Sequence, residues 1–144
     1  MLKTHQPRAF VARLDSRTES TPLARYMLRA YLSGLPSGER YGDTAELILG
    51  ELFANAVQHS DAPDDRHIEI RFTLIDSRLR IEVHDADTTH PALHVPSLDD
   101  EHGRGLFLVN KLAERWGSAS HPGGIGKFVW AHIAPVPTPA LVTV

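Results

Sequence analysis

Residues 51–59 read Glu-Leu-Phe-Ala-Asn-Ala-Val-Gln-His and place a carboxylate, an amide and an imidazole four residues apart. Residues four apart lie above one another on a helix, so Glu51, Asn55 and His59 would form one polar stripe. A broad apolar face accompanies the stripe and is supplied by Ala45, Ile48, Leu49, Leu52, Phe53, Ala56 and Val57. A carboxylate and an amide at the edge of a buried face suit divalent-metal and proton-transfer chemistry.

The bulk composition indicates one domain and argues against several classes of protein. The chain has 144 residues and a formal net charge of -3, so no basic footprint suggests a nucleic-acid or anionic-membrane partner. It contains no cysteine, which excludes disulfides, thiolate metal sites and a cysteine nucleophile. No apolar run approaches the roughly 20 residues of a membrane span, and the first residues begin no signal peptide. We therefore expect a cytoplasmic protein.

The order of predicted elements is strand, two helices, two strands, a long loop, a helix and a final hairpin. It indicates an α+β fold: a two-layer sandwich in which helices cover one face of a mainly antiparallel, mixed sheet. We expect one domain over residues 8–134 and a mobile, proline-containing tail over 135–144. The expected strands are 8–14, 67–74 and 78–85, the last two joined by a turn at Asp76-Ser77; the helices are 20–33, 39–59 and 103–116; the hairpin is 117–133.

Three further clusters could complete a site with the polar stripe. Asp85 ends a buried strand, where its carboxylate could accept a hydrogen bond from an exocyclic amine such as a nucleobase offers. Gly103-Arg104-Gly105 opens a helix, whose free N–H groups suit phosphate. A glycine-rich turn at 123–126 brings the ammonium of Lys127 toward the same region. The loop 86–102 between these clusters has no periodicity, as is typical of a lid over a site.

In this order and spacing, the clusters resemble the boxes of the GHKL superfamily of ATP-binding domains, the Bergerat fold. Residues 51–59 match its N box, E-x-x-x-N-x-x-x-H. Asp85-Ala86-Asp87 falls where the G1 box belongs, and Gly103-Arg104-Gly105-Leu106 matches the G2 box. Residues 126–130 lie where the last glycine-containing box enters the final strand. The chain is most similar to the small bacterial anti-sigma-factor serine/threonine kinases and their stand-alone regulatory relatives, and the resemblance covers about residues 20–133.

The resemblance implies a role for each matched residue. Asn55 would ligate Mg²⁺ through its side-chain oxygen. Glu51 would orient or deprotonate the attacking hydroxyl. Asp85 would bind the adenine amino group of ATP. The phosphates would be bound by the G2-box residues Gly103, Arg104, Gly105 and Leu106, with Lys127 added from the last box.

The resemblance further implies a protein kinase that phosphorylates an anti-anti-sigma (STAS-type) partner and sequesters a sigma factor, and it makes a homodimer plausible. Two departures keep a second reading open. Asp87 stands where the G1 box usually has glycine, and Phe128 stands where relatives carry a hydroxyl residue. The alternative is therefore a nucleotide-sensing or catalytically inactive module that binds a partner without phosphotransfer.

Each cluster also has a simpler interpretation. Glu51 and Asn55 could be the solvated face of a helix, and Lys127 could be an exposed hairpin lysine, which is the commoner position for that residue. The first helix carries Arg and Tyr of the kind enriched at interfaces, but solvated side chains would look the same; these residues are Arg25, Tyr26, Arg29 and Tyr31. A zinc site would draw on His84, Asp85, Asp87, His90, His94 and His102. Pro91 separates two of those histidines and no His-Glu-x-x-His pattern exists, so zinc is disfavoured.

Overall fold

The computed structural model describes residues 9–58, 66–85, 104–121 and 126–137. Its strands are β1 (Phe10–Asp15), β2 (His67–Ile75), β3 (Arg78–Asp85), β4 (Arg115–Ser120) and β5 (Lys127–Ile133). Its α-helices are α1 (Thr21–Ser33), α2 (Gly42–Gln58) and α3 (Arg104–Leu112), and short 3-10 helices span Thr18–Ser20 and Gly38–Arg40. The strands form one sheet in the order β1-β2-β3-β5-β4, and each neighbouring pair is antiparallel.

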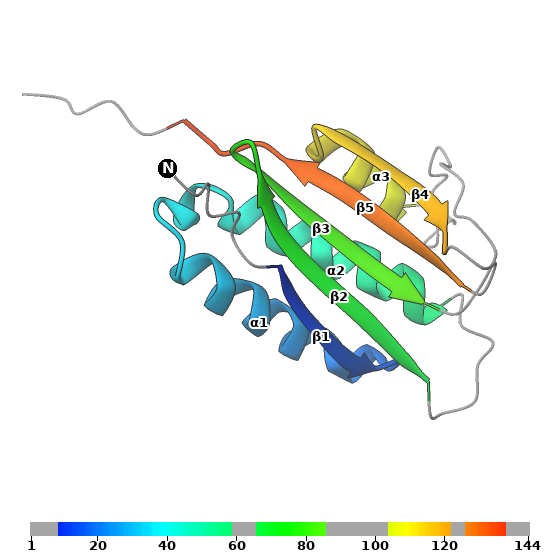
Figure 1. Cartoon of the computed structure of the whole chain (residues 1–144). Helices are drawn as coiled ribbons and strands as arrows, with labels where there is room; N and C mark the ends of the chain where they lie inside the picture. Colours follow the sequence, from blue (N-terminus) through cyan, green and yellow to red (C-terminus); the bar gives the residue numbers. More distant parts are fainter. Residues whose placement is uncertain (1–8, 59–65, 86–103, 122–125, 138–144) are drawn as a thin grey trace, which may run out of the picture.

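All three α-helices lie on one face of this sheet, with α2 between α1 and α3 (Figure 1). The predicted two-layer α+β sandwich is therefore confirmed. The expected turn between β2 and β3 is also present. Asp76 and Ser77 both have positive φ, 48° and 63°, as a two-residue hairpin turn requires to match the twist of its strands.

The core lies between the helices and the helix-facing side of the sheet. Strand alternation sends every second residue of β2, β3 and β5 into it. These strand residues, all at most 4% exposed, are Ile68, Ile70, Phe72, Leu79, Ile81, Val83, Val129, Ala131 and Ile133. The helix α2 packs its apolar stripe against them through Ala45, Ile48, Leu49, Leu52, Phe53 and Ala56. Burying this much apolar surface is the main favourable term in folding.

The third helix is shorter than its sequence pattern predicts. It ends at Leu112, and Trp116, which we expected in the helix, belongs to β4. The backbone N–H of Ala113 still bonds to the carbonyl of Val109, but the next N–H, of Glu114, bonds to His132 of β5. The helical spacing of apolar residues continues to Trp116, but from Glu114 onward the backbone pairs with β5 instead of continuing the helix.

The structure changes the expectation for one of the two tyrosines of α1. Tyr31 is not an exposed residue of α1, because its ring packs 5.8 Å from that of Phe72 and 6.2 Å from that of Phe10. Tyr26, in contrast, is 62% exposed. The beginning of the proline-containing tail is attached to the domain: Val136 and Arg40 exchange two hydrogen bonds, of 2.7 and 2.8 Å.

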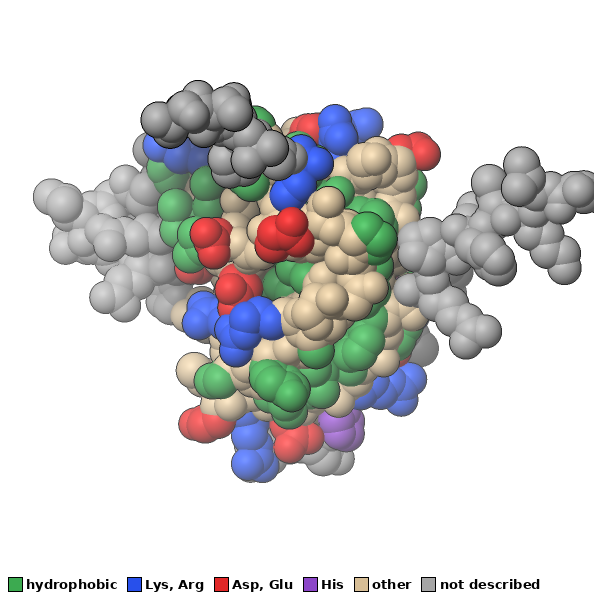
Figure 2. All heavy atoms as spheres, turned by 90° about the vertical axis from the view of Figure 1, so that its left-hand side faces the viewer, with side chains coloured by type: hydrophobic (Ala, Val, Ile, Leu, Met, Phe, Trp, Pro, Cys, Tyr) green, Lys and Arg blue, Asp and Glu red, His purple; other side chains and the backbone are tan. Residues whose placement is uncertain are grey.

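The face of the molecule that looks left in Figure 1 carries acidic and basic side chains interspersed among apolar ones (Figure 2). This face therefore has no patch of a single charge sign. No helix in the described part of the chain is both long and apolar enough to span a membrane.

Replacing Gly38 by alanine is expected to destabilise the fold. A Cβ at this position would lie 1.9 Å from the carbonyl oxygen of Leu32. Because that neighbour is backbone and cannot rotate away, we expect the free energy of unfolding to fall by about 1–3 kcal/mol. Gly42→Ala is the matched control, since a Cβ there meets nothing within 4 Å. Urea unfolding measures both variants, and equal stabilities would contradict the close packing at Gly38.

Candidate functional site

A row of polar residues crosses the helix-facing side of the sheet at one end. On this side, the residue pairs formed by β3 and β5 are apolar from Leu79–Ile133 to Val83–Val129. The last pair, Asp85 and Lys127, at the end of β3, is charged. The strand β4 continues the row, because Ser120 is the register partner of Lys127. The helix-facing surface therefore changes from apolar to polar where β3 and β4 end and β5 begins.

The N-box helix presents its polar side at the same end. Figure 1 shows the C-terminal end of α2 at the edge where β3 ends. The side of α2 that faces α1 carries Gly50, and the guanidinium of Arg25 packs against it. A Cβ added to Gly50 would lie 2.4 Å from that guanidinium. Glu51 and Asn55 lie about 100° and 140° around the helix axis from Gly50, and α3 packs on the other side of α2. The polar stripe therefore faces the gap between α2 and α3 rather than open solvent alone.

Asn55 has the properties expected of a residue that binds a hard cation. It is 7% exposed, and its side chain makes no hydrogen bond to any part of the chain that the structure describes. The carbonyl oxygen of such an amide is a ligand that Mg²⁺ accepts. Glu51, one turn earlier, is partly exposed. The simple reading of Asn55 as a solvated helix residue is wrong.

Lys127 differs from the simpler expectation. We considered it an exposed hairpin lysine, but it is 2% exposed. The reason is the phase of β5: the strand begins at Lys127, and alternation places this residue on the same side as Val129 and Ala131. Its neighbour Phe128 faces the opposite side, where its ring stacks on His84 with centroids 4.7 Å apart. Phe128 therefore removes no contact from the helix-facing site.

The remaining predicted site residues are only partly described. Arg104 and Gly105 are the first residues of α3, and Leu106 is 3% exposed and belongs to the core. Gly103, His59, Asp87 and the expected lid over 86–102 lie outside the described residues. The structure thus pairs Asp85 with Lys127 and places the C-terminal half of α2, which carries Glu51 and Asn55, at the same end of the sheet. Of the residues considered for zinc, only His84 and Asp85 are described, and the described residues hold no cluster suited to a metal.

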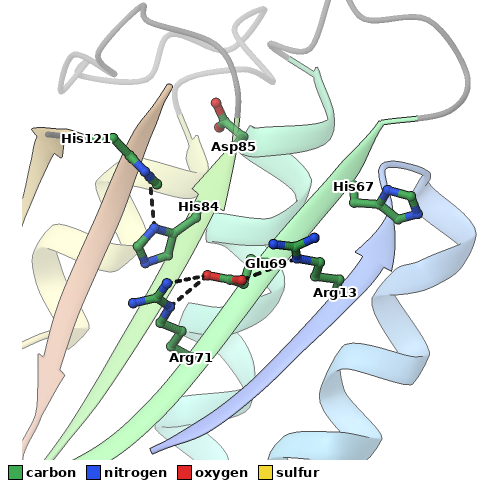
Figure 3. Close-up of a pocket in the computed structure, with 7 residues that line it drawn as sticks. All are labelled: Arg13, His67, Glu69, Arg71, His84, Asp85 and His121. Atoms are coloured by element: carbon green, nitrogen blue, oxygen red, sulfur yellow. Dashed lines mark hydrogen bonds and ion pairs between the residues drawn. The ribbon is translucent and has the colours of Figure 1, made fainter. Parts of the chain in front are cut away.

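The sequence analysis did not find a second polar cluster, which lies on the open face of the sheet. A hollow of about 420 Å³ there is lined by Arg13, His67, Glu69, Arg71, His84, Asp85 and His121 (Figure 3). Within it, His84 bonds through Nδ1 to His121 Nε2 at 2.9 Å and through Nε2 to Glu82 at 2.7 Å. Asp85, the last residue of β3, reaches only the rim of this hollow and points away from the hydrogen-bonded side chains. The alternation of Arg80, Glu82 and His84 along β3 was the available signal for this cluster.

The carboxylates on this open face are strongly stabilised in their charged form. The hydrogen bond from His84, with the hydrogen bond and charge of Arg80, outweighs the effect of burial and lowers the pKa of Glu82 from 4.5 to about 2. Burial would raise the pKa of Glu69, but the hydrogen bond and charge of Arg71, with the hydrogen bond of Arg13, lower it. Because ionised Glu82 accepts from His84 Nε2, a neutral His84 must accept from His121 at Nδ1. This chain of hydrogen bonds fixes the orientation of His84.

Acid titration should reveal the contribution of Glu82. Its folded-state pKa is depressed, so its stabilisation is complete above about pH 4.5 and is lost as the pH falls toward about 2. Glu82→Gln removes the charge that His84 and Arg80 stabilise, so we expect it to lower the free energy of unfolding near neutral pH. The loss should be only on the order of 1–2 kcal/mol, because the side chain of Glu82 is 18% exposed and solvent screens its charge. The difference from the unmodified protein should shrink below about pH 4. Glu114→Gln is the control, since Glu114 pairs with Arg78 at the surface; an equal loss in both variants would contradict the assignment.

Comparison with known proteins agrees with this geometry. The family of the histidine kinase-like ATPase domain matches residues 14–132. Among solved structures, the RsbU and RsbW domains of Rv1364c from Mycobacterium tuberculosis are similar, with a TM-score of 0.61 and 18% identity over 94% of this chain. This chain covers 35% of that one. A histidine kinase domain from the blue-light activated histidine kinase of Erythrobacter litoralis EL346 gives a TM-score of 0.47 and 18% identity, over 85% of this chain and 62% of that one. No match was found among the curated proteins.

The family match covers most of the chain, including α2, β3, α3 and β5. The likeness to the Mycobacterium tuberculosis structure, at 18% identity, agrees with it in fold. The resemblance to the GHKL superfamily stated from the N and G2 boxes is thereby confirmed. The chain belongs to the family of histidine kinase-like ATPase domains.

Proposed function

We propose that this protein binds Mg-ATP at the end of the sheet marked by Asp85 and Lys127, and that it transfers phosphate to a serine or threonine of an anti-anti-sigma (STAS-type) partner. In the same proposal it also binds a sigma factor and acts in transcription regulation in the cytoplasm. Membership of an ATPase domain family supports nucleotide binding. The observation that carries the proposal is the meeting of the Glu51–Asn55 stripe with the polar row of the sheet at one end of an otherwise apolar core.

Each residue has one task in this proposal. Asn55 holds Mg²⁺ through its amide oxygen, and the ion, when bound, neutralises charge on the phosphates. Asp85 accepts a hydrogen bond from the adenine amino group. Glu51 orients the hydroxyl of the partner and accepts its proton. The G2-box residues Gly103, Arg104 and Gly105 bind the phosphates through backbone N–H groups, as residues at helix N-termini can.

The similar Mycobacterium tuberculosis structure is described as containing an RsbW domain. Its fold likeness supports the anti-sigma-factor class, and the boxes support ATP as the ligand. The alternative is a nucleotide-sensing or catalytically inactive module that binds its partner without phosphotransfer. The carboxylate of Asp87 keeps this alternative open, whereas Phe128 no longer favours it because its ring lies on the open face.

Asn55→Ala should weaken the binding of Mg-ATP by about tenfold or more, because the cation loses a protein ligand. Binding of ATP in the presence of a chelator should change much less. Asn110→Ala is the matched control: Asn110 is the other asparagine of the chain, and it accepts a hydrogen bond from Trp116. Isothermal titration calorimetry measures all three proteins. Unchanged Mg-ATP affinity in Asn55→Ala would exclude Asn55 as the magnesium ligand.

Glu51→Gln should retain ATP binding within about threefold but lower phosphotransfer by about 10²-fold or more, since the amide cannot accept the proton. The measurement is incorporation of labelled phosphate into a STAS-type partner. Glu46→Gln is the control on the same helix, because Glu46 pairs with Arg29 of α1 instead of facing the site. If the unmodified protein binds ATP and the partner but transfers no phosphate, the kinase proposal fails and the binding-module alternative stands.

A further inference from the structure

The row of Asp85, Lys127 and Ser120 differs from every other row on the helix-facing side of β3, β5 and β4. The pairs Leu79–Ile133, Ile81–Ala131 and Val83–Val129 are apolar, and each is buried. The last row instead places a carboxylate, an ammonium and a hydroxyl side by side in register. Directly opposite residues on neighbouring antiparallel strands have Cβ atoms about 4.5–5.5 Å apart, which is within reach of an ion pair.

The burial of Lys127 requires a negative partner. Its side chain is 2% exposed, and an ammonium removed from water without an anion costs several kcal/mol, on the order of the penalty for any buried ion. On the described part of the chain, the acidic residues that face the layer between sheet and helices are Asp85 and Glu51. Glu69 and Glu82 lie on the open face and pair with arginines there. Asp85 is the one that register places opposite Lys127.

We propose that Lys127 is a positioning residue for base recognition: it holds one oxygen of the Asp85 carboxylate, so that the other is directed at the exocyclic amine of a purine. This inference rests on the proposed nucleotide site and refines it, because it assigns Lys127 to the base and not to the phosphates. Ser120 extends the row from β4. A carboxylate fixed in this way accepts from the 6-amino group of adenine but meets the 6-oxo group of hypoxanthine as a second acceptor.

The test compares ADP with IDP, which differ at the 6-position of the base and carry the same phosphates. The unmodified protein should bind ADP about tenfold or more tightly than IDP, as expected for a hydrogen bond to a charged group. In Lys127→Met, ADP affinity should fall by about tenfold while IDP affinity changes less than about threefold, so the ADP-to-IDP ratio collapses. Lys111→Met is the control, because Lys111 lies over the ring of Phe107 on the exposed side of α3.

The possible outcomes separate this proposal from the one it rests on. If ADP and IDP weaken together in Lys127→Met and their ratio is kept, Lys127 contacts phosphate and the inference is wrong. An unchanged affinity for both ligands also overturns it. If the unmodified protein binds neither nucleotide, the proposed function itself fails, and the inference fails with it.

A stability measurement keeps the test informative if Lys127→Met folds poorly. Removing one member of a buried ion pair leaves an uncompensated charge, whereas removing both does not. Lys127→Met alone should therefore lower the melting temperature by roughly 4 °C or more, and the double variant Asp85→Asn/Lys127→Met should recover most of that loss. A double variant that is as unstable as the sum of its single variants would show that the two side chains are not partners.

Discussion

The packing of α2 against the helix-facing side of the sheet is the constraint on which the rest of the structure depends. It buries a broad apolar face of α2, and α1 and α3 pack on either side of that helix. A helix fixed by one face has only its remaining sides available for polar groups. The side toward α1 is closed by Arg25 over Gly50. Glu51 and Asn55 therefore occupy the side toward α3, which is where the proposed ligand would lie.

Strand alternation divides the chemistry of the protein between two faces. Asp85 and Lys127 face the helices, while their chain neighbours His84 and Phe128 face the open side and stack on each other. The hydrogen-bonded chain through His121, His84 and Glu82 thus shares its backbone with the proposed site. These hydrogen bonds on the open face restrain the backbone at the end of β3. Order at this position is useful because a carboxylate that recognises a base must be held in one direction.

Family membership and geometry support different parts of the functional argument. The family match gives the class of domain, and the fold likeness agrees with it. Neither identifies a partner or a transferred phosphate. The geometry adds that Asn55, the predicted magnesium ligand, is buried, and that the lysine of the last box is enclosed opposite Asp85. These observations are the basis for the roles proposed for single residues.

Much of this protein was determined by its sequence alone. The spacing of apolar residues located α2, the alternation located β2 and β3, and the order of the boxes indicated the family, because these are local or short-range patterns. Only the tertiary structure decided that Trp116 belongs to β4, that Lys127 is buried, and that Phe128 faces away from the site. Each of these depends on the residue at which a strand begins and on its pairing partner. Since a shift of one residue reverses every side chain in a strand, the phase is fixed by distant pairing and not by the local sequence.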